Sequence, residues 1–295
     1  MTSFMVKVPA SSANLGPGFD SMGMAVNMYL TLKVTEQDAW KIIPSSVPAD
    51  IPLDEHLIYQ VVMQTVEKFG KAIRPCRVEE TSGIPLARGL GSSAAAIVAG
   101  IEIADRLGGL ELTQEEKLSL ATEIEGHPDN VAPALLGGLV ISTYLDGKVE
   151  WMKISELDVE LVAYIPEMEL KTKAARDVLP QNYANAEAAL ASSIGNLTVA
   201  ALMSGDFELA GKMMEKDRFH EPYRKTLIPN YDCIKRAAKN LGAYGTVISG
   251  AGPTMMSFVP KGSAEKFVAH FQNELEDYNV LALEMDESGA TTKEM

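Results

Sequence analysis

Apolar and polar residues alternate along several short segments of the chain, which is the pattern of half-buried β-strands. Between Val26 and Val34 every second residue is apolar, and Phe4, Val6 and Val8 repeat the pattern near the N-terminus. The strands that this pattern predicts are residues 4–8, 26–34, 76–81, 139–143, 159–165, 247–248, 255–259 and 280–283.

Longer segments have apolar residues at helical spacing or are rich in alanine. Thr113 and Glu116 have the spacing of a capping box, so one helix begins after Thr113. The predicted helices are residues 56–69, 94–107, 113–125, 182–204, 230–241 and 263–275. Strands and helices are mixed rather than strictly alternating, which favours an α+β fold over a doubly wound parallel sheet. We place a domain boundary near residue 155, which gives domains of residues 1–155 and 156–295.

The charge balance restricts the classes of partner. The 295 residues include 40 acidic and 26 basic side chains, a formal net charge of −14. We therefore expect the protein to repel nucleic acid and anionic membranes. Cys76 and Cys233 lie far apart in the sequence, which indicates a reducing compartment and no disulfide framework. Because we find no signal peptide and no run approaching the ~20 apolar residues of a membrane span, we expect a cytoplasmic protein.

A glycine-rich segment, residues 85–96, carries the clearest chemistry. Its glycines permit backbone angles that other residues resist, and the alanine-rich helix after it offers unpaired N–H groups to a phosphate. It is not the usual P-loop, because Ser92 rather than lysine follows Gly91. A tight loop with a serine N-cap is the alternative explanation. The residues expected to contact a phosphate-bearing ligand are Pro85, Leu86, Ala87, Arg88, Gly89, Leu90, Gly91, Ser92, Ser93, Ala94 and Ala95.

Two further segments complete a set of three motifs. Residues 9–20 read PASSANLGPGFD, and residues 249–254 read SGAGPT. In order and separation, the three motifs resemble those of the GHMP small-molecule kinases, which are named for galactokinase, homoserine kinase, mevalonate kinase and phosphomevalonate kinase. Segments 125–134, 172–180 and 217–224 resemble the homoserine kinase branch in particular.

The resemblance implies a fold and a reaction. It implies an N-terminal domain like domain 2 of ribosomal protein S5 and a ferredoxin-like C-terminal domain. It also implies transfer of phosphate from ATP, with Mg²⁺, to L-homoserine, which gives O-phospho-L-homoserine on the way to threonine. The family further suggests a homodimer. In the resemblance, Gly250 and Gly252 of the third motif support the phosphate loop by close packing.

The magnesium ligands follow from the same resemblance. A magnesium ion prefers hard oxygen ligands, which the family takes from a loop serine and a glutamate on the next helix. Ser92 or Ser93 supplies the hydroxyl. Glu123 is our choice for the carboxylate, with Glu125 as the competing candidate, and a plain surface glutamate is the alternative role for Glu123.

The resemblance also assigns residues to the amino-acid substrate. Arg176 and Arg224 match positions that hold the carboxylate, although isolated arginines are more often surface ion-pair partners. Asp20 and Asn14 match the pair that accepts the ammonium, or they simply close the loop through hydrogen bonds to the backbone. His127 contacts the substrate or fixes its loop. The final substrate contact is Thr172.

Catalysis is expected to proceed without an aspartate base. Mevalonate kinase-like relatives use an aspartate in this region, whereas Asn130 stands here with Asp129 beside it. Asparagine cannot take a proton, and a loose phosphoryl-transfer transition state needs little activation of the attacking oxygen. We therefore assign orientation and electrostatic roles to the catalytic set of Asn130, Glu123, Asn14 and Asp20. The rival hypotheses are a kinase for another small alcohol, such as mevalonate, and a non-catalytic nucleotide-binding regulator.

Overall fold

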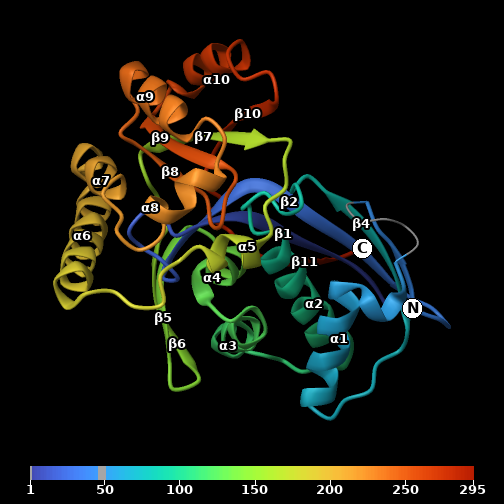
Figure 1. The fold of residues 1–295 in the computed structure, drawn as a ribbon. Helices are drawn as coiled ribbons and strands as arrows, with labels where there is room; N and C mark the ends of the chain where they lie inside the picture. The colour runs from blue at the N-terminus through green and yellow to red at the C-terminus, as the bar shows by residue number, and fades with distance from the viewer. Residues whose placement is uncertain (1, 46–50) are drawn as a thin grey trace.

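Two β-sheets organise the chain (Figure 1). The computed structural model describes residues 2–45 and 51–295. The strands are β1 (Ser3–Ala13), β2 (Met22–Glu36), β3 (Lys41–Ile43), β4 (Cys76–Ser82), β5 (Leu139–Leu145), β6 (Lys148–Ile154), β7 (Val159–Pro166), β8 (Gly245–Ile248), β9 (Met255–Pro260), β10 (Tyr278–Leu283) and β11 (Thr291–Glu294). The helices are α1 (Leu57–Lys68), α2 (Ser92–Gly108), α3 (Gln114–Glu125), α4 (Pro128–Leu136), α5 (Thr172–Asp177), α6 (Asn185–Ser204), α7 (Phe207–Met214), α8 (Glu221–Arg224), α9 (Tyr231–Leu241) and α10 (Ala264–Gln272), with short 3₁₀ turns η1 (Leu53–Glu55) and η2 (Lys225–Leu227).

The first sheet has the order β11-β1-β2-β4-β3, and the β5–β6 hairpin joins it along β2. Phe4, Val6 and Val8 of β1 are fully buried and oppose the equally buried side chains of β2. Helices α2 and α4 pack on β1, and α1 packs on α2. The apolar positions of the alternating pattern therefore lie on the face of the sheet that helices cover. Helix α2, which follows the glycine-rich loop, packs directly on this face.

The second sheet has the order β10-β7-β9-β8, and all of its pairs are antiparallel. The chain enters through β7, crosses a set of helices to the β8–β9 hairpin, and returns through α10 to β10. This is the β-α-β-β-α-β order of a ferredoxin-like domain, so the expected second fold is confirmed. Phe267 and Phe271 of α10 are buried in the core of this second domain. The Phe271 ring packs edge to face against Tyr164 of β7, with 4.7 Å between the ring centroids.

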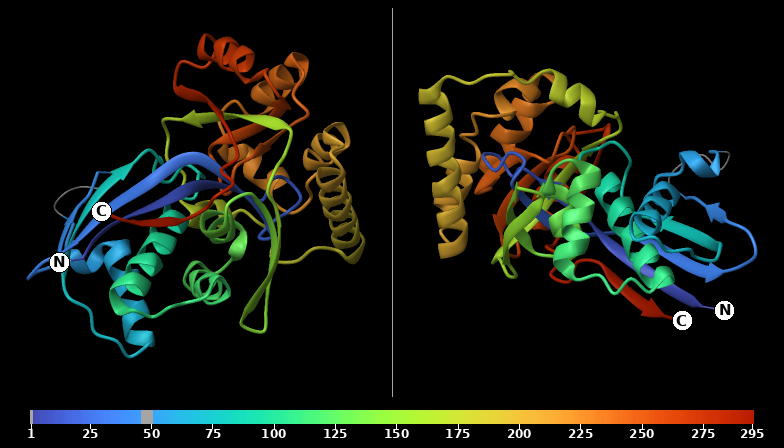
Figure 2. Two further views of the ribbon diagram at one scale, coloured as in Figure 1. Left: turned by 180° about the vertical axis from the view of Figure 1, so that it is seen from behind. Right: turned by 90° about the horizontal axis from the view of Figure 1, so that it is seen from below.

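The two ends of the chain meet in the first sheet. Strand β11 pairs antiparallel with β1, with Met5 opposite Lys293, and Figure 2 shows the two termini side by side. The boundary predicted near residue 155 falls in the connection between β6 and β7. Residues 291–294 nevertheless pair within the first sheet, so the region 156–295 is not confined to the second one.

Helix α6 contradicts one expectation from the sequence, because it has the length and composition that could span a membrane. It has 20 residues, a mean hydropathy of 1.3 over an 18-residue window, and only 28% of that window is buried. One such helix is weak evidence for a membrane span. Helix α6 packs against α7, and polar side chains such as Asn185, Ser193 and Asn196 lie along it. These features are those of a surface helix of a globular domain.

Candidate active site

The glycine-rich loop leads directly into α2. Gly89 and Gly91 have φ angles of 74° and 68°, in the left-handed region that favours glycine. A Cβ on Gly89 would lie 2.3 Å from the carbonyl oxygen of Ser249, so this loop and the third motif pack closely. The N-cap of α2 is Gly91, without a side-chain cap, and Ser92 is the first helical residue. The alternative of a serine N-cap is therefore wrong, and the first N–H groups of a 17-residue helix can serve an anion.

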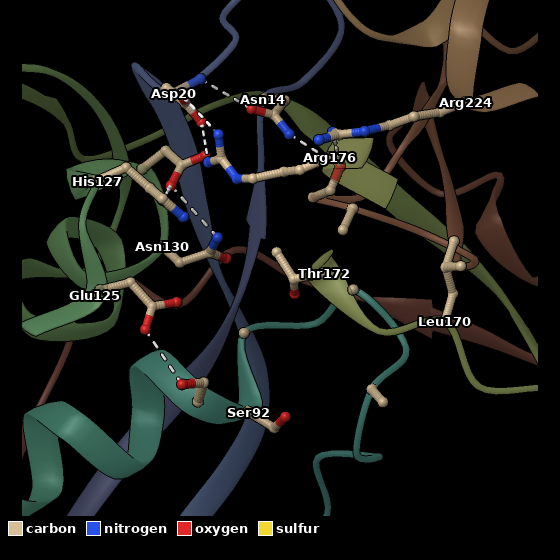
Figure 3. A pocket seen from close by; sticks show the side chains of 17 residues that line it. Asn14, Asp20, Ser92, Glu125, His127, Asn130, Leu170, Thr172, Arg176 and Arg224 are labelled. Atoms are coloured by element: carbon tan, nitrogen blue, oxygen red, sulfur yellow. Dashed lines mark hydrogen bonds and ion pairs between the residues drawn. The ribbon is translucent and has the colours of Figure 1, made fainter. Parts of the chain in front are cut away.

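A pocket between the two domains collects most of the residues that the sequence assigns to the site (Figure 3). Its lining is Asn14, Asp20, Ala87, Gly89, Gly91, Ser92, Ser93, Glu125, His127, Asp129, Asn130, Leu170, Thr172, Arg176, Arg224, Gly250 and Ala251. The expected nucleotide contacts that do not line it are Pro85, Leu86, Arg88, Leu90, Ala94 and Ala95. The side chain of Arg88 instead donates to the Pro166 and Glu167 carbonyls and pairs with Glu169.

The two candidate glutamates on α3 point in different directions. The Glu123 side chain is 55% exposed and forms an ion pair with Lys68 of α1, away from the pocket. The Glu125 side chain enters the pocket, where its Oε2 accepts a hydrogen bond from Ser93 Oγ at 3.2 Å. Two residues along a helix rotate the side chain by roughly 200°, so only one of the pair can face α2. The placement of Glu123 at the site is therefore corrected, and Glu125 takes its place.

The Ser93–Glu125 pair suits a hard cation. Burial raises the pKa of Glu125, although His127 and the Ser93 hydrogen bond oppose the shift. Burial is the largest of these effects, so it disfavours the charged form of this carboxyl group, and a bound cation would favour that form. Hydroxyl and carboxylate oxygens are the ligands that Mg²⁺ prefers, and Ser92 lines the same wall of the pocket.

Arg176 and Asp20 meet each other across the pocket. Arg176 Nη2 and Nη1 donate to the two Asp20 carboxylate oxygens at 2.7 and 3.2 Å, a bidentate pair. The Phe19 ring lies beside both guanidinium groups, 5.6 Å from that of Arg176 and 5.3 Å from that of Arg224. The family resemblance assigns these two arginines and Asp20 to one substrate. In the structure, all three line the same end of the pocket.

Arg224 is a buried cation. Its Nε donates to the Ala175 carbonyl at 3.0 Å, and its Nη1 lies 3.1 Å from the Gly250 carbonyl and 3.3 Å from His220 Nδ1. Burial first, and the charge of Arg176 second, lower the pKa of Arg224 to about 10, so the group stays charged at neutral pH. Within the described residues, no carboxylate forms a hydrogen bond or ion pair with it. Its Nη2 therefore remains available to an anion in the pocket.

Asn14 closes the first loop. Its Nδ2 donates to the Gly250 carbonyl at 2.9 Å, and its Oδ1 accepts from the backbone N–H of Asp20 at 3.0 Å. Asn14 is 3% exposed, and both Asn14 and Asp20 have positive φ. The hydrogen bonds of Asn14 therefore close the loop, which is the second of the two roles considered from the sequence. By closing the loop, they hold Asp20 in the pocket.

The His-Pro-Asp-Asn segment begins α4 beneath the phosphate loop. His127 Nδ1 is hydrogen-bonded to Asp129. Burial lowers the pKa of His127, but the hydrogen bond and charge of Asp129 outweigh burial, so the net pKa is raised. Asn130 Oδ1 accepts from Ser11 Oγ at 2.9 Å. This bond turns the Asn130 Nδ2 group towards Asp129 Oδ1, 3.4 Å away. A side-chain amide is not a base, so Asn130 can donate or accept hydrogen bonds but cannot take a proton.

A second pocket adjoins the first and shares Ser92 and Ser93 with it. The other lining residues, mostly apolar, are Leu30, Ile51, Glu55, His56, Leu57, Ile58, Glu80, Ser82, Ile84, Leu86 and Ala96. His56 is 8% exposed, and neither ring nitrogen has a hydrogen-bond partner among the residues that the structure describes. Burial lowers the pKa of His56, with Glu80 opposing the shift. No sequence motif predicted this pocket, and its walls come from four separate stretches of the chain, Leu30 and residues 51–58, 80–86 and 92–96.

Comparison with known proteins agrees with this geometry. The GHMP kinases N terminal domain matches residues 56–138, and the GHMP kinases C terminal domain matches residues 198–277. The chain is 51% identical over 296 residues to a homoserine kinase of Oceanobacillus iheyensis, covering 100% of both proteins. It is 47% identical to a homoserine kinase of Bacillus velezensis, covering 97% of this chain and 94% of the relative.

Solved structures give the same result. The crystal structure of homoserine kinase from Cytophaga hutchinsonii has a TM-score of 0.87 and 29% identity, covering 99% of this chain and 98% of the other. The Methanococcus jannaschii mevalonate kinase, at 17% identity, covers 95% of this chain and 98% of its own, and it shares the fold with a TM-score of 0.72. The protein therefore belongs to the GHMP kinase family, among relatives that are homoserine kinases.

Proposed function

We propose that the protein is a homoserine kinase, which transfers the γ-phosphoryl group of ATP to the side-chain hydroxyl of L-homoserine and releases O-phospho-L-homoserine and ADP. The observation that carries the proposal is one pocket in which a phosphate-binding helix start faces paired cationic and anionic side chains. An amino acid offers the matching charges, an ammonium and a carboxylate on one carbon. The product lies on the way to threonine, and we place the enzyme in the cytoplasm.

The nucleotide extends over both pockets. Its phosphates lie at the start of α2, where backbone N–H groups of residues 91–93 and the helix dipole favour negative charge. The shared serines connect this position to the apolar second pocket, which suits an adenine base. The base would meet the ring nitrogens of His56 there, which have no hydrogen-bond partner in the described part of the chain. This division explains why one pocket is polar and its neighbour is apolar.

Ser93 and Glu125 would hold the magnesium ion, with Ser92 beside them. When bound, the ion supplies positive charge that neutralises the phosphate oxygens during transfer. The protein's contribution is to keep a hydroxyl and a carboxylate 3.2 Å apart at the start of α2.

Homoserine is oriented by its charged end. The free Nη2 of Arg224 and the guanidinium of Arg176 bind its carboxylate, and the Asp20 carboxylate accepts its ammonium. Asn14 acts through the loop by holding Asp20. His127 and Thr172 line the pocket between this end and the phosphate position, where the side chain of homoserine passes.

Phosphoryl transfer then proceeds by positioning. The Nδ2 group of Asn130 donates a hydrogen bond to the homoserine hydroxyl and points it at the γ-phosphorus. The hydroxyl oxygen forms the new P–O bond, the bond to the β-phosphate oxygen breaks, and the hydroxyl proton passes to a γ-phosphate oxygen. A loose transition state makes an aspartate base unnecessary.

The test is an ADP-release assay, with L-homoserine, mevalonate and galactose offered separately at equal concentrations. We expect turnover with homoserine alone. Turnover with mevalonate in its place would refute the assigned substrate, and failure with all three would favour a nucleotide-binding regulator. Asn130→Ala with full turnover would refute the role of Asn130.

A further inference from the structure

His220 lies at the junction between the first loop and the helix that carries Arg224. It is fully buried and precedes α8 as its N-cap residue. Its Nε2 is 2.8 Å from the Gly16 carbonyl oxygen, and its Nδ1 is 3.3 Å from Arg224 Nη1. The ring also stacks on Phe19, at 5.5 Å between centroids and 23° between planes. One imidazole thus contacts both sides of the amino-acid end of the pocket.

These contacts define the protonation state of the ring. A carbonyl oxygen can only accept a hydrogen bond, so Nε2 must carry the proton. A guanidinium group can only donate, so Nδ1 must be bare. The neutral Nε2–H form is the one that satisfies both partners.

Among the described residues, the charged side chains recorded in contact with the ring are Asp217 and Arg224. Asp217 Oδ2 is 3.7 Å from Nε2, but it already accepts from the backbone N–H groups of His220 and Glu221 at 2.8 and 2.7 Å. The Arg224 guanidinium faces Nδ1, to which it can only donate a hydrogen bond.

The bare nitrogen determines how Arg224 is presented. Gly250 and His220 take the hydrogens of Nη1, and the Ala175 carbonyl takes that of Nε, so the guanidinium plane is fixed at three points. The two hydrogens of Nη2 are left for a ligand. Of the three acceptors, His220 is the one that a side-chain substitution can remove.

We propose that His220 is a positioning residue, which sets the spacing between the carboxylate-binding Nη2 of Arg224 and the ammonium-binding Asp20. It does so by accepting from Arg224 and donating to Gly16 in the loop that carries Asp20. The inference rests on the proposed function, because it gives that spacing a purpose: an α-amino acid has both charges on one carbon. A loop free to shift relative to Arg224 would bind this pair of charges less tightly.

Two variants of His220 each remove one of the two hydrogen bonds that its ring nitrogens form. In His220→Asn, the side-chain Oδ1 can stand near the position of Nδ1 and accept from Arg224, while the bond to Gly16 is lost. In His220→Gln, the side-chain Nε2 can reach the Gly16 carbonyl, while the acceptor for Arg224 is lost. Steady-state kinetics with homoserine and with ATP, together with thermal melting, compare both with the wild type.

We expect His220→Gln to raise KM for homoserine about tenfold or more, which corresponds to one hydrogen bond to a charged group, with KM for ATP within about twofold. His220→Asn should also raise KM for homoserine, because it breaks the bond to the Gly16 carbonyl and frees the loop that carries Asp20. An unchanged KM for homoserine in either variant, or an equal rise in KM for ATP, would contradict the proposal. If wild-type protein fails to phosphorylate homoserine, the proposed function falls rather than this step.

A spectroscopic readout needs no His220 variant and no substrate. The ¹⁵N signals of the four histidines are recorded on the wild-type protein at pH 7.5. The signals of His56, His127 and His270 are assigned by replacing each in turn, which leaves that of His220. We expect the neutral Nε2–H form. A protonated ring, or a proton on Nδ1, would overturn the proposal even if the His220 variants failed to fold.

Discussion

Replacing Glu125 and Glu123 one at a time gives a matched test of the site. The residues lie two positions apart on α3, and only Glu125 faces the pocket. Glu125→Gln keeps the side-chain size and removes the charge that would hold the cation beside Ser93. Loss of one such electrostatic group typically lowers kcat by about 10²–10³, or about 2.7–4 kcal/mol of transition-state stabilisation.

The control substitution should have little effect. In the Lys68–Glu123 ion pair the side chains are 46% and 55% exposed, and exposed pairs contribute at most about 1 kcal/mol to stability. Glu123→Gln should therefore keep kcat within about twofold. Both variants are assayed by ADP release over a titration of Mg²⁺, because a lost ligand raises the Mg²⁺ requirement.

Stability gives an independent signature. Because the pKa of Glu125 is raised by burial, its ionised form is disfavoured in the folded protein, and this carboxyl costs stability at pH values above its folded pKa. Without Mg²⁺ at pH 7.5, Glu125→Gln should therefore melt at a higher temperature than the wild type while losing activity. A fall in both melting temperature and activity, or equal activity loss in Glu123→Gln, would refute the reasoning.

Three further predictions use other parts of the site. Arg224→Lys should raise KM for homoserine about tenfold or more with KM for ATP nearly unchanged, because a lysine cannot replace the fixed fork of donors; equal changes in both constants would contradict it. Gly89→Ala should cost at least about 1 kcal/mol in urea unfolding, from its positive φ alone, and it should raise KM for ATP because the Ser249 carbonyl blocks a Cβ. The pKa of His56 is lowered by burial, so below about pH 6.5 the unfolded chain binds more protons than the folded protein, and the free energy of unfolding should decrease as the pH is lowered. Urea unfolding at pH 7.5 and 5.5 should show a smaller decrease in His56→Gln than in the wild type, and an equal decrease would argue against a buried, neutral His56.

Local patterns predicted much of the fold. The helix over 94–107 is α2, which begins two residues earlier at Ser92, and the capping box of Thr113 and Glu116 forms as expected. Helix α4 was not predicted, since Pro128 and Pro133 both lie within it and proline usually interrupts helices. Pro128 occupies the first turn, where a missing N–H costs nothing.

The candidate site was predicted as a set of residues, but their mutual contacts were not. The motifs identified Asp20, Arg176 and Arg224, whereas the Asp20–Arg176 pairing requires a loop and a helix 156 residues apart to meet. The helical rotation between Glu123 and Glu125 shows from the sequence that only one of them can face α2, but which one does so depends on how α3 packs. His220 carried no signal of its own, because its role depends on a carbonyl in the first loop and a guanidinium one turn later.

Strand β11 has a consequence for how the protein is made. The edge of β1 that β11 covers stays open from the start of synthesis until residues 291–294 emerge. An open strand edge is a template for pairing with other chains. A fragment of residues 1–155 would keep that edge permanently, so cutting the chain between the two sheets should yield an aggregation-prone piece rather than an independent nucleotide-binding unit.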